Sequence, residues 1–126
     1  MTWNVNSLRS WLPRLLGLWE RESPDIVCLQ ETKVSDLDFP ILGLDQAGYQ
    51  AVTHGLGGSA GVAILSKHQA TGAEAEFAGN PLPDQARVIA ATVDGIRVVS
   101  VYVVNGRSPD DPAYQAKLEW LAAITT

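Results

Sequence analysis

The sequence has one cysteine, two histidines and no long apolar run. The single thiol, Cys28, excludes an internal disulfide, suits a reducing cytoplasmic setting and is expected to pack in the core. No stretch reaches the length of about 18 apolar residues that a membrane span requires, so no membrane contact is predicted. The first residues also lack the basic and then apolar pattern of a signal peptide.

Positive charge is scarce as well. Nine Lys and Arg residues face 14 Asp and Glu residues, which gives a formal net charge of −5. A module that binds nucleic acid through bulk electrostatic attraction carries the opposite sign. The charge does not exclude an enzyme that holds a phosphate through a metal ion and a few local basic side chains. The chain has 126 residues, 46% of them hydrophobic, and fits one domain with a sizeable core.

Apolar spacing predicts a strand, a helix and a second strand at the start of the chain. Thr2 to Val5 is short and β-prone. Leucines and tryptophans then recur every three or four residues, which predicts a helix from about Leu12 to Glu22, with Pro13 in its first turn. The run from Ile26 to Leu29 is typical of a buried strand. Such a unit implies parallel pairing of the two strands.

The rest of the chain is predicted to add short strands and two helices. The predicted elements are a helix at 40–47, strands at 49–53 and 61–66, a surface connection at 67–86, strands at 87–93 and 96–102 extended to 104, and a helix at 113–124. Asp94-Gly95 is a hairpin turn signal. The last helix is expected to bury Leu118, Leu121 and Ala122. This order predicts an α/β (α+β) fold: a mixed β-sheet with flanking helices on one face and an uncovered opposite face.

Polar side chains follow the predicted strands at the points where they end. Asn4 and Asn6 follow the first strand, Glu31 follows its parallel neighbour, and Tyr102 and Asn105 follow the last strand. Ligands of open α/β sheets bind at the carboxyl ends of the strands. Carboxylate and amide oxygens suit a hard divalent cation, and a phenol and an amide can hold phosphate oxygens. Such a site suits phosphodiester cleavage by metal-assisted attack of water.

Each of these residues also has a purely structural explanation. Glu31 can serve only as the polar cap of a strand. Asn4 and Asn6 can serve as turn or cap residues. Tyr102 can be a strand-end tyrosine whose hydroxyl is satisfied by a backbone partner. The residues alone leave both explanations open.

Four segments resemble successive blocks of the exodeoxyribonuclease III and abasic-site endonuclease family, part of a larger set of enzymes shaped like deoxyribonuclease I. They are Thr-Trp-Asn-Val-Asn-Ser-Leu-Arg at 2–9, Pro-Asp-Ile-Val-Cys-Leu-Gln-Glu-Thr-Lys at 24–33, Gly-Val-Ala-Ile-Leu-Ser at 61–66 and Val-Tyr-Val-Val-Asn-Gly at 101–106. The resemblance implies one half of a four-layered α/β-sandwich. It also implies Mg²⁺- or Mn²⁺-dependent cleavage of double-stranded DNA at abasic sites and 3′ ends.

The resemblance also implies roles for individual residues. Glu31 corresponds to the family's metal-ligand glutamate, Asn4 to a catalytic asparagine beside the metal, and Asn6 to a position near the metal. Tyr102 corresponds to the catalytic tyrosine that approaches the scissile phosphate. The three positions that correspond to substrate-binding residues are Asn105, Lys33 and Arg87.

Other features depart from the family pattern. The matching blocks cover only the N-terminal half of the family domain, as residues 1–126. The Gly-Asp-x-Asn and Ser-Asp-His blocks, which supply the general acid and catalytic histidine, are absent. His54 and His68 are expected at the surface. Val104 stands in place of a proline, and Ala60 in place of an asparagine.

These departures lead us to expect a weak or inactive chain. Because the absent half would supply the second sheet, the uncovered sheet face would drive self-association. The alternatives are a non-catalytic fragment that binds DNA or a partner, and a phosphodiesterase of the same fold that acts on RNA or another phosphoester.

Overall fold

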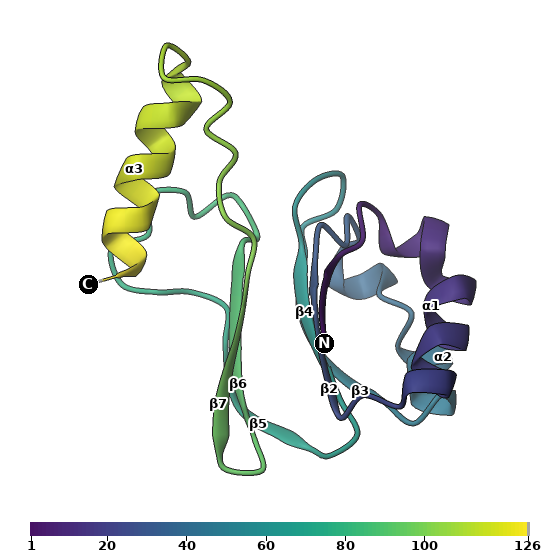
Figure 1. Ribbon diagram of the computed structural model, residues 1–126. Helices are drawn as coiled ribbons and strands as arrows, with labels where there is room; N and C mark the ends of the chain where they lie inside the picture. Colours follow the sequence, from purple (N-terminus) through teal and green to yellow (C-terminus); the bar gives the residue numbers. More distant parts are fainter. Residues whose placement is uncertain (126) are drawn as a thin grey trace.

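The computed structural model describes residues 1–125, and these form two β-sheets that pack face to face (Figure 1). The first sheet has the order β1-β2-β4-β3 and the second the order β5-β6-β7. The strands are β1 (Thr2–Asn4), β2 (Ile26–Gln30), β3 (Gln50–His54), β4 (Val62–Ser66), β5 (Ala70–Glu74), β6 (Val88–Val93) and β7 (Ile96–Val101). The helices are α1 (Leu8–Glu22), α2 (Ile41–Gln46) and α3 (Pro112–Ile124), with a 3₁₀ turn η1 (Asp36–Asp38).

The predicted strand–helix–strand unit at the start of the chain is confirmed. β1 pairs with β2 in parallel, with Asn4 opposite Gln30. Helix α1 covers the outer face of the first sheet together with α2 (Figure 1). Leu15 and Trp19 of α1 are buried against Val27 and Leu29 of β2. The 3.6-residue spacing of the apolar side chains therefore identified the buried face of this helix.

The predicted start of this helix was wrong, because α1 begins at Leu8 rather than Leu12. Leu8 is fully buried, and its backbone N–H donates to the Thr32 carbonyl over 3.0 Å. The loop after β2 thus satisfies first-turn donors that a cap would otherwise serve. Pro13 lies inside the helix and is exposed. Tertiary contacts at Leu8 outweigh the helix-breaking tendency of the proline.

The prediction of one mixed sheet with an uncovered face was wrong in its arrangement. The β6–β7 hairpin has its turn at Asp94-Gly95, as predicted. It is not part of the first sheet but forms a second sheet with β5. The space between the sheets is filled by apolar side chains from both: Val62, Ile64, Ile89 and Ala91, with Cys28 and Val98 packed against them. The chain therefore contributes to both sheets, and the inner face expected to be bare is covered by its own hairpin. The fold class itself, α/β with flanking helices, is confirmed.

One strand was missed and another was predicted too long. β5 lies in the segment expected to be a surface connection, and its sequence, Ala-Thr-Gly-Ala-Glu, has no apolar alternation. Pairing with β6 fixes it as an exposed edge strand. β7 ends at Val101, so Val103 and Val104 are not part of a strand. Val104 instead packs on Trp120 of α3.

Helix α3 lies beyond the second sheet and closes a separate apolar cluster. Its start is capped by the Asp111 side chain, which accepts from Ala113 N over 2.9 Å. Trp120 is fully buried, and Leu121 packs in the same cluster, but Leu118 is 44% exposed. Ala122 is exposed as well, so the expectation was wrong for both Leu118 and Ala122. No helix among residues 1–125 is long and apolar enough to cross a membrane.

Candidate functional site

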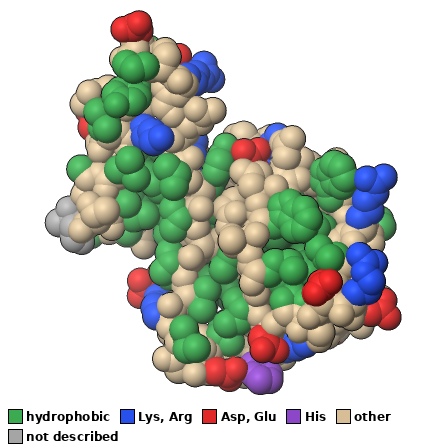
Figure 2. Space-filling model, in the orientation of Figure 1, with side chains coloured by type: hydrophobic (Ala, Val, Ile, Leu, Met, Phe, Trp, Pro, Cys, Tyr) green, Lys and Arg blue, Asp and Glu red, His purple; other side chains and the backbone are tan. Residues whose placement is uncertain are grey.

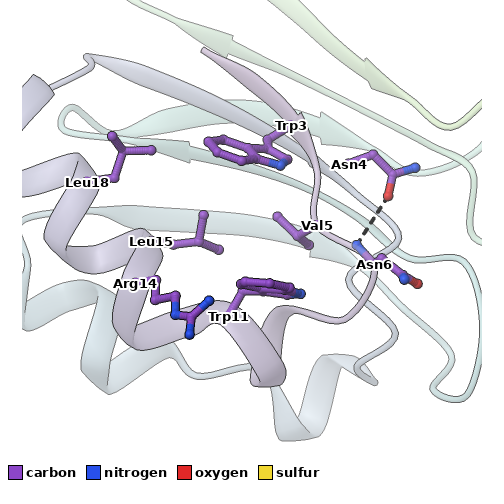
Figure 3. A pocket seen from close by; sticks show the side chains of 8 residues that line it. All are labelled: Trp3, Asn4, Val5, Asn6, Trp11, Arg14, Leu15 and Leu18. Carbon is purple, nitrogen blue, oxygen red and sulfur yellow. Dashed lines mark hydrogen bonds between the residues drawn. The ribbon is translucent and has the colours of Figure 1, made fainter.

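The ends of β1, β2 and β7 bring the predicted site residues together. Asn4 ends β1, and its Nδ2 donates to Glu31 Oε1 over 3.1 Å. Asn4 Oδ1 accepts from the backbone N–H of Asn6 over 3.2 Å, a bond drawn in Figure 3. Tyr102, one residue beyond β7, has its hydroxyl within hydrogen-bonding reach of the Glu31 carboxylate. Asn4 at the end of the first sheet and Tyr102 beyond the second therefore meet at the Glu31 carboxylate.

The backbone around Glu31 has an unusual conformation. Glu31 and Lys33 have φ values of 53° and 56°, in the left-handed region that L-residues seldom occupy. Glu31 O accepts from Ser7 N over 2.8 Å, which ties the loop after β2 to the segment after β1. Strained backbone of this kind persists where the surrounding contacts over-determine it, and it clusters at functional sites.

Gly61 supports the same loop from the other side. Its carbonyl accepts from Thr32 N over 3.1 Å, and Ala60 O accepts from Lys33 N over 2.9 Å. A Cβ atom at Gly61 would lie 2.2 Å from Thr32 Oγ1, and the glycine φ is 96°. Only glycine fits this close approach, so the loop that carries Glu31 is held on both flanks.

Hydrogen bonding keeps Glu31 ionised. The contact with the Tyr102 hydroxyl is the largest cause and lowers the pKa of Glu31; burial, the next largest, raises it, and Asn4 and Lys33 lower it further. Lys33 Nζ lies 3.7 Å from Glu31 Oε2 and donates to Asn6 Oδ1 over 2.6 Å. Burial, followed by the Glu31 carboxylate, raises the pKa of Tyr102, so its phenol stays protonated at neutral pH.

The other predicted substrate-binding residues lie beside Tyr102. The Arg87 guanidinium stacks on the Tyr102 ring, with its Cζ 4.6 Å from the ring centroid. Arg87, Tyr102, Asn105 and Arg107 line a groove of about 530 Å³ that α3 borders. Asn105 Oδ1 accepts from Arg107 N over 2.9 Å, so Asn105 organises its own loop and does not contact Glu31.

Three residues that contribute to the site region were not identified from the sequence. Gln30 and Ser100 form a buried hydrogen bond between the sheets, and Arg107 lines the groove beside Tyr102. A lone serine inside an apolar strand was the available signal for Ser100.

His68 is exposed, as expected. The His54 side chain is only 15% exposed and lies 3.9 Å from Glu76, so the expectation that His54 lies at the surface was wrong.

A second groove, of about 350 Å³, lies at the outer edge of β1 (Figure 3). Trp3 of β1 and Trp11 of α1 flank it, Leu15 and Leu18 form its floor, and Asn4 and Asn6 stand at its rim. Trp3 and Trp11 are 47% and 44% exposed. In Figure 2, hydrophobic side chains also gather at the surface on the part of the molecule that holds β1 and α1.

The side chains at the strand ends can supply only some of the ligands that a hard divalent cation needs. Among residues 1–125 no three His, Cys, Asp or Glu side chains gather as a metal cluster. Glu31 supplies one carboxylate, and Asn4 and Asn6 supply amide oxygens. The Lys33 ammonium lies among these oxygens, so the site already stabilises positive charge. This set suits Mg²⁺, which keeps several waters and takes one or two carboxylates plus substrate phosphates.

Comparisons with known proteins identify the family of the chain. Residues 1–125 match the model of the Endonuclease/Exonuclease/phosphatase family. The 3′ phosphatase NExo from Neisseria, solved with a product DNA hairpin, superimposes with a TM-score of 0.95 and 42% identity, over 98% of this chain and 48% of that one. An AP endonuclease from Archaeoglobus fulgidus gives a TM-score of 0.93 and 38% identity over the same shares.

Exodeoxyribonuclease III of Haemophilus influenzae is 31% identical over 112 residues, which are 86% of this chain and 42% of that protein. The chain thus spans about half the length of the relatives it matches. The range that matches the family model, residues 1–125, contains Asn4, Glu31 and Tyr102. The chain belongs to the Endonuclease/Exonuclease/phosphatase family.

Proposed function

We propose that residues 1–126 form the N-terminal half of a DNA repair phosphodiesterase domain that acts at abasic sites and on 3′ ends of double-stranded DNA. The observation that carries the proposal is the Glu31 carboxylate, held between Asn4 of one sheet and Tyr102 of the other. The relatives support the choice of DNA, since the Neisseria enzyme was solved with a DNA hairpin and is described as a 3′ phosphatase. The single half-buried thiol of Cys28, whose pKa burial raises, fits a reducing cytoplasmic location.

In this proposal Glu31, Asn4 and Asn6 hold a Mg²⁺ or Mn²⁺ ion. Such an ion neutralises charge on a phosphate oxygen. The protonated Tyr102 phenol donates a hydrogen bond to the scissile phosphate. The Asn105 amide and the Lys33 ammonium contact the phosphate backbone on either side.

The same geometry favours a weak catalyst when the chain acts alone. Both histidines of residues 1–125 lie beside carboxylates other than Glu31: His68 pairs with Asp94 in the hairpin turn, and His54, the last residue of β3, lies 3.9 Å from Glu76. A general acid or base for attack of water is therefore not supplied from these positions. Residues of a catalytic set act as a unit, so a partial set retains only a small share of the rate.

The test is cleavage of a duplex carrying one abasic site, with Mg²⁺ or Mn²⁺, by the chain and its Glu31→Ala variant. Glu20→Ala, on the exposed side of α1, is the matched control. Cleavage by the chain and by the control, and none by Glu31→Ala, supports a working site. A Glu31→Ala variant that cuts as fast as the unchanged chain contradicts the proposal.

A non-catalytic role is the second candidate, and the position of both histidines beside other carboxylates, Glu76 and Asp94, favours it. In that case the chain binds the same duplex without cutting it. A substrate panel with RNA and other phosphoesters separates the third possibility, a phosphodiesterase of the same fold with another substrate.

We also propose that the chain self-associates through the apolar edge around Trp3. β1 and β7 are edge strands of their sheets. The two sheets are stacked so that β2 lies over β7, and β1 therefore extends past the edge of the second sheet. All three residues of β1 are exposed. An uncharged edge strand beside an apolar groove is a template for pairing with another chain.

A further inference from the structure

Arg87 uses its side chain and its backbone to hold one residue, Tyr102. Its Nη1 donates to the Tyr102 carbonyl oxygen over 3.2 Å, and its Cζ lies 4.6 Å from the centre of the Tyr102 ring. The Tyr102 backbone N–H donates in return to the Arg87 carbonyl over 2.8 Å. Arg87 Nε donates to Gln85 Oε1 over 2.5 Å, which fixes the guanidinium from the opposite side.

We propose that Arg87 is a positioning residue that holds the Tyr102 phenol against Glu31, and that it does not itself contact DNA. The inference rests on the proposed function, in which Tyr102 meets the scissile phosphate. The backbone bond from Tyr102 to Arg87 extends the β6–β7 pairing by one residue, but it does not orient the Tyr102 ring. The stacked guanidinium orients the ring, because its plane can cover the ring while its N–H groups bond the backbone.

The environment of the two arginines in the groove separates their roles. Arg87 is partly buried, and two of its nitrogen atoms already have acceptors inside the chain. Arg107 lines the same groove with a side chain that is 72% exposed, and its ion pair with Asp111 is long, at 3.9 Å. A phosphate would therefore meet Arg107 without displacing internal hydrogen bonds, whereas binding at Arg87 would break them.

The spectroscopic test compares Arg87→Lys with the matched control Arg107→Lys in the full chain. Order and resonance positions of the tyrosine rings are measured by NMR with ¹³C-labelled tyrosine. The chain has three tyrosines, so Tyr49 and Tyr114 serve as internal references. Arg87→Lys keeps the charge but loses the planar fork, so we expect the Tyr102 ring to lose order and its resonances to shift. We expect Tyr49 to stay unchanged in both variants and Tyr102 to stay unchanged in Arg107→Lys.

The binding test measures the salt dependence of affinity for a duplex with one abasic site. Each lost phosphate contact lowers the slope of log affinity against log salt by about 0.9. We expect that loss for Arg107→Gln and no change of slope for Arg87→Gln. An unchanged Tyr102 ring in Arg87→Lys, or a slope reduced by about 0.9 in Arg87→Gln, overturns the inference. A chain that does not bind the duplex contradicts the proposed function alone, because the Tyr102 spectra still decide the role of Arg87.

Discussion

Gln30 Nε2 donates a buried hydrogen bond to Ser100 Oγ over 3.1 Å, and it joins two residues that lie 70 positions apart in the chain. Ser100 Oγ donates in turn to the Leu29 carbonyl over 3.1 Å. Gln30 precedes Glu31, and Ser100 lies two residues before Tyr102. The bond therefore fixes the separation of the two sheets beside the point where Glu31 and Tyr102 meet.

Replacement of Ser100 by alanine should destabilise the fold. The Gln30 amide would lose one of its two acceptors and keep Thr2 Oγ1, and the loss of one such hydrogen bond costs about 0.5–1.5 kcal/mol. Urea unfolding measures the difference. Ser10→Ala on the exposed side of α1 is the control and should change stability by less than about 0.5 kcal/mol. Equal stability of the Ser100 variant and the unchanged chain would show that the bond between the sheets contributes nothing.

Replacement of Gly61 by alanine should disturb the loop that carries Glu31. The new Cβ atom would lie 2.2 Å from Thr32 Oγ1 at a φ of 96°. We expect the free energy of unfolding, measured by urea unfolding, to fall by about 1–3 kcal/mol. We also expect weaker Mn²⁺ binding, measured by calorimetric titration. Gly43→Ala in α2 is the matched control, since a Cβ there meets no atom within 4 Å. It should gain about 0.5–1 kcal/mol in helix stability. Unchanged Mn²⁺ affinity in Gly61→Ala would show that the conformation of this loop does not contribute to metal binding.

Stability should fall as pH rises past neutrality because of His68. Its Nδ1 lies 2.6 Å from Asp94 Oδ2, and the hydrogen bond and charge of Asp94 raise the pKa of His68 in the folded chain. Asp25 raises it slightly, and Lys67 lowers it. Because the pKa of His68 is higher in the folded chain, its pairing with Asp94 stabilises the fold fully at pH values below the unfolded pKa of about 6.5. This stabilisation is lost as the pH rises through the pKa of the folded chain.

Urea unfolding from pH 5.5 to 8.5 tests this prediction. The unchanged chain should lose more stability over this range than His68→Gln. Asp94→Asn should flatten the curve in the same way, because it removes the partner. Parallel curves for the chain and His68→Gln would contradict the prediction.

A lysine on the edge strand should reduce self-association. Trp3→Lys places a charge on β1 beside the apolar groove, which opposes strand pairing with a second copy. Light scattering over a range of concentrations should show a concentration-dependent mass for the chain and a monomer for this variant. Leu37→Lys is the control, since Leu37 is 98% exposed on η1, away from β1. A chain that stays monomeric throughout rules out the edge as a contact.

Most of the local elements, and the strand-end positions of Asn4, Glu31 and Tyr102, were predictable from the sequence because each has a local signal. The apolar run before Glu31 identified β2, and Asp94-Gly95 identified the hairpin. Position at the strand ends identified Asn4 and Tyr102. The division into two sheets was not predictable, because residues 67–86 carry no apolar pattern that shows where the chain leaves the first sheet. The start of α1 at Leu8 depended on hydrogen bonds to the loop after β2, which no spacing within the helix reveals.

The hairpin and the bond between Gln30 and Ser100 also differ in the time they need to form. The β6–β7 hairpin closes through a two-residue turn, and such hairpins form in about 1–10 μs. The Gln30–Ser100 bond spans 70 residues and has to wait until both sheets exist, because long loops are costly to close. We therefore expect the meeting of Glu31 and Tyr102 to be one of the last events of folding. The chain would acquire its secondary structure well before it acquires its candidate site.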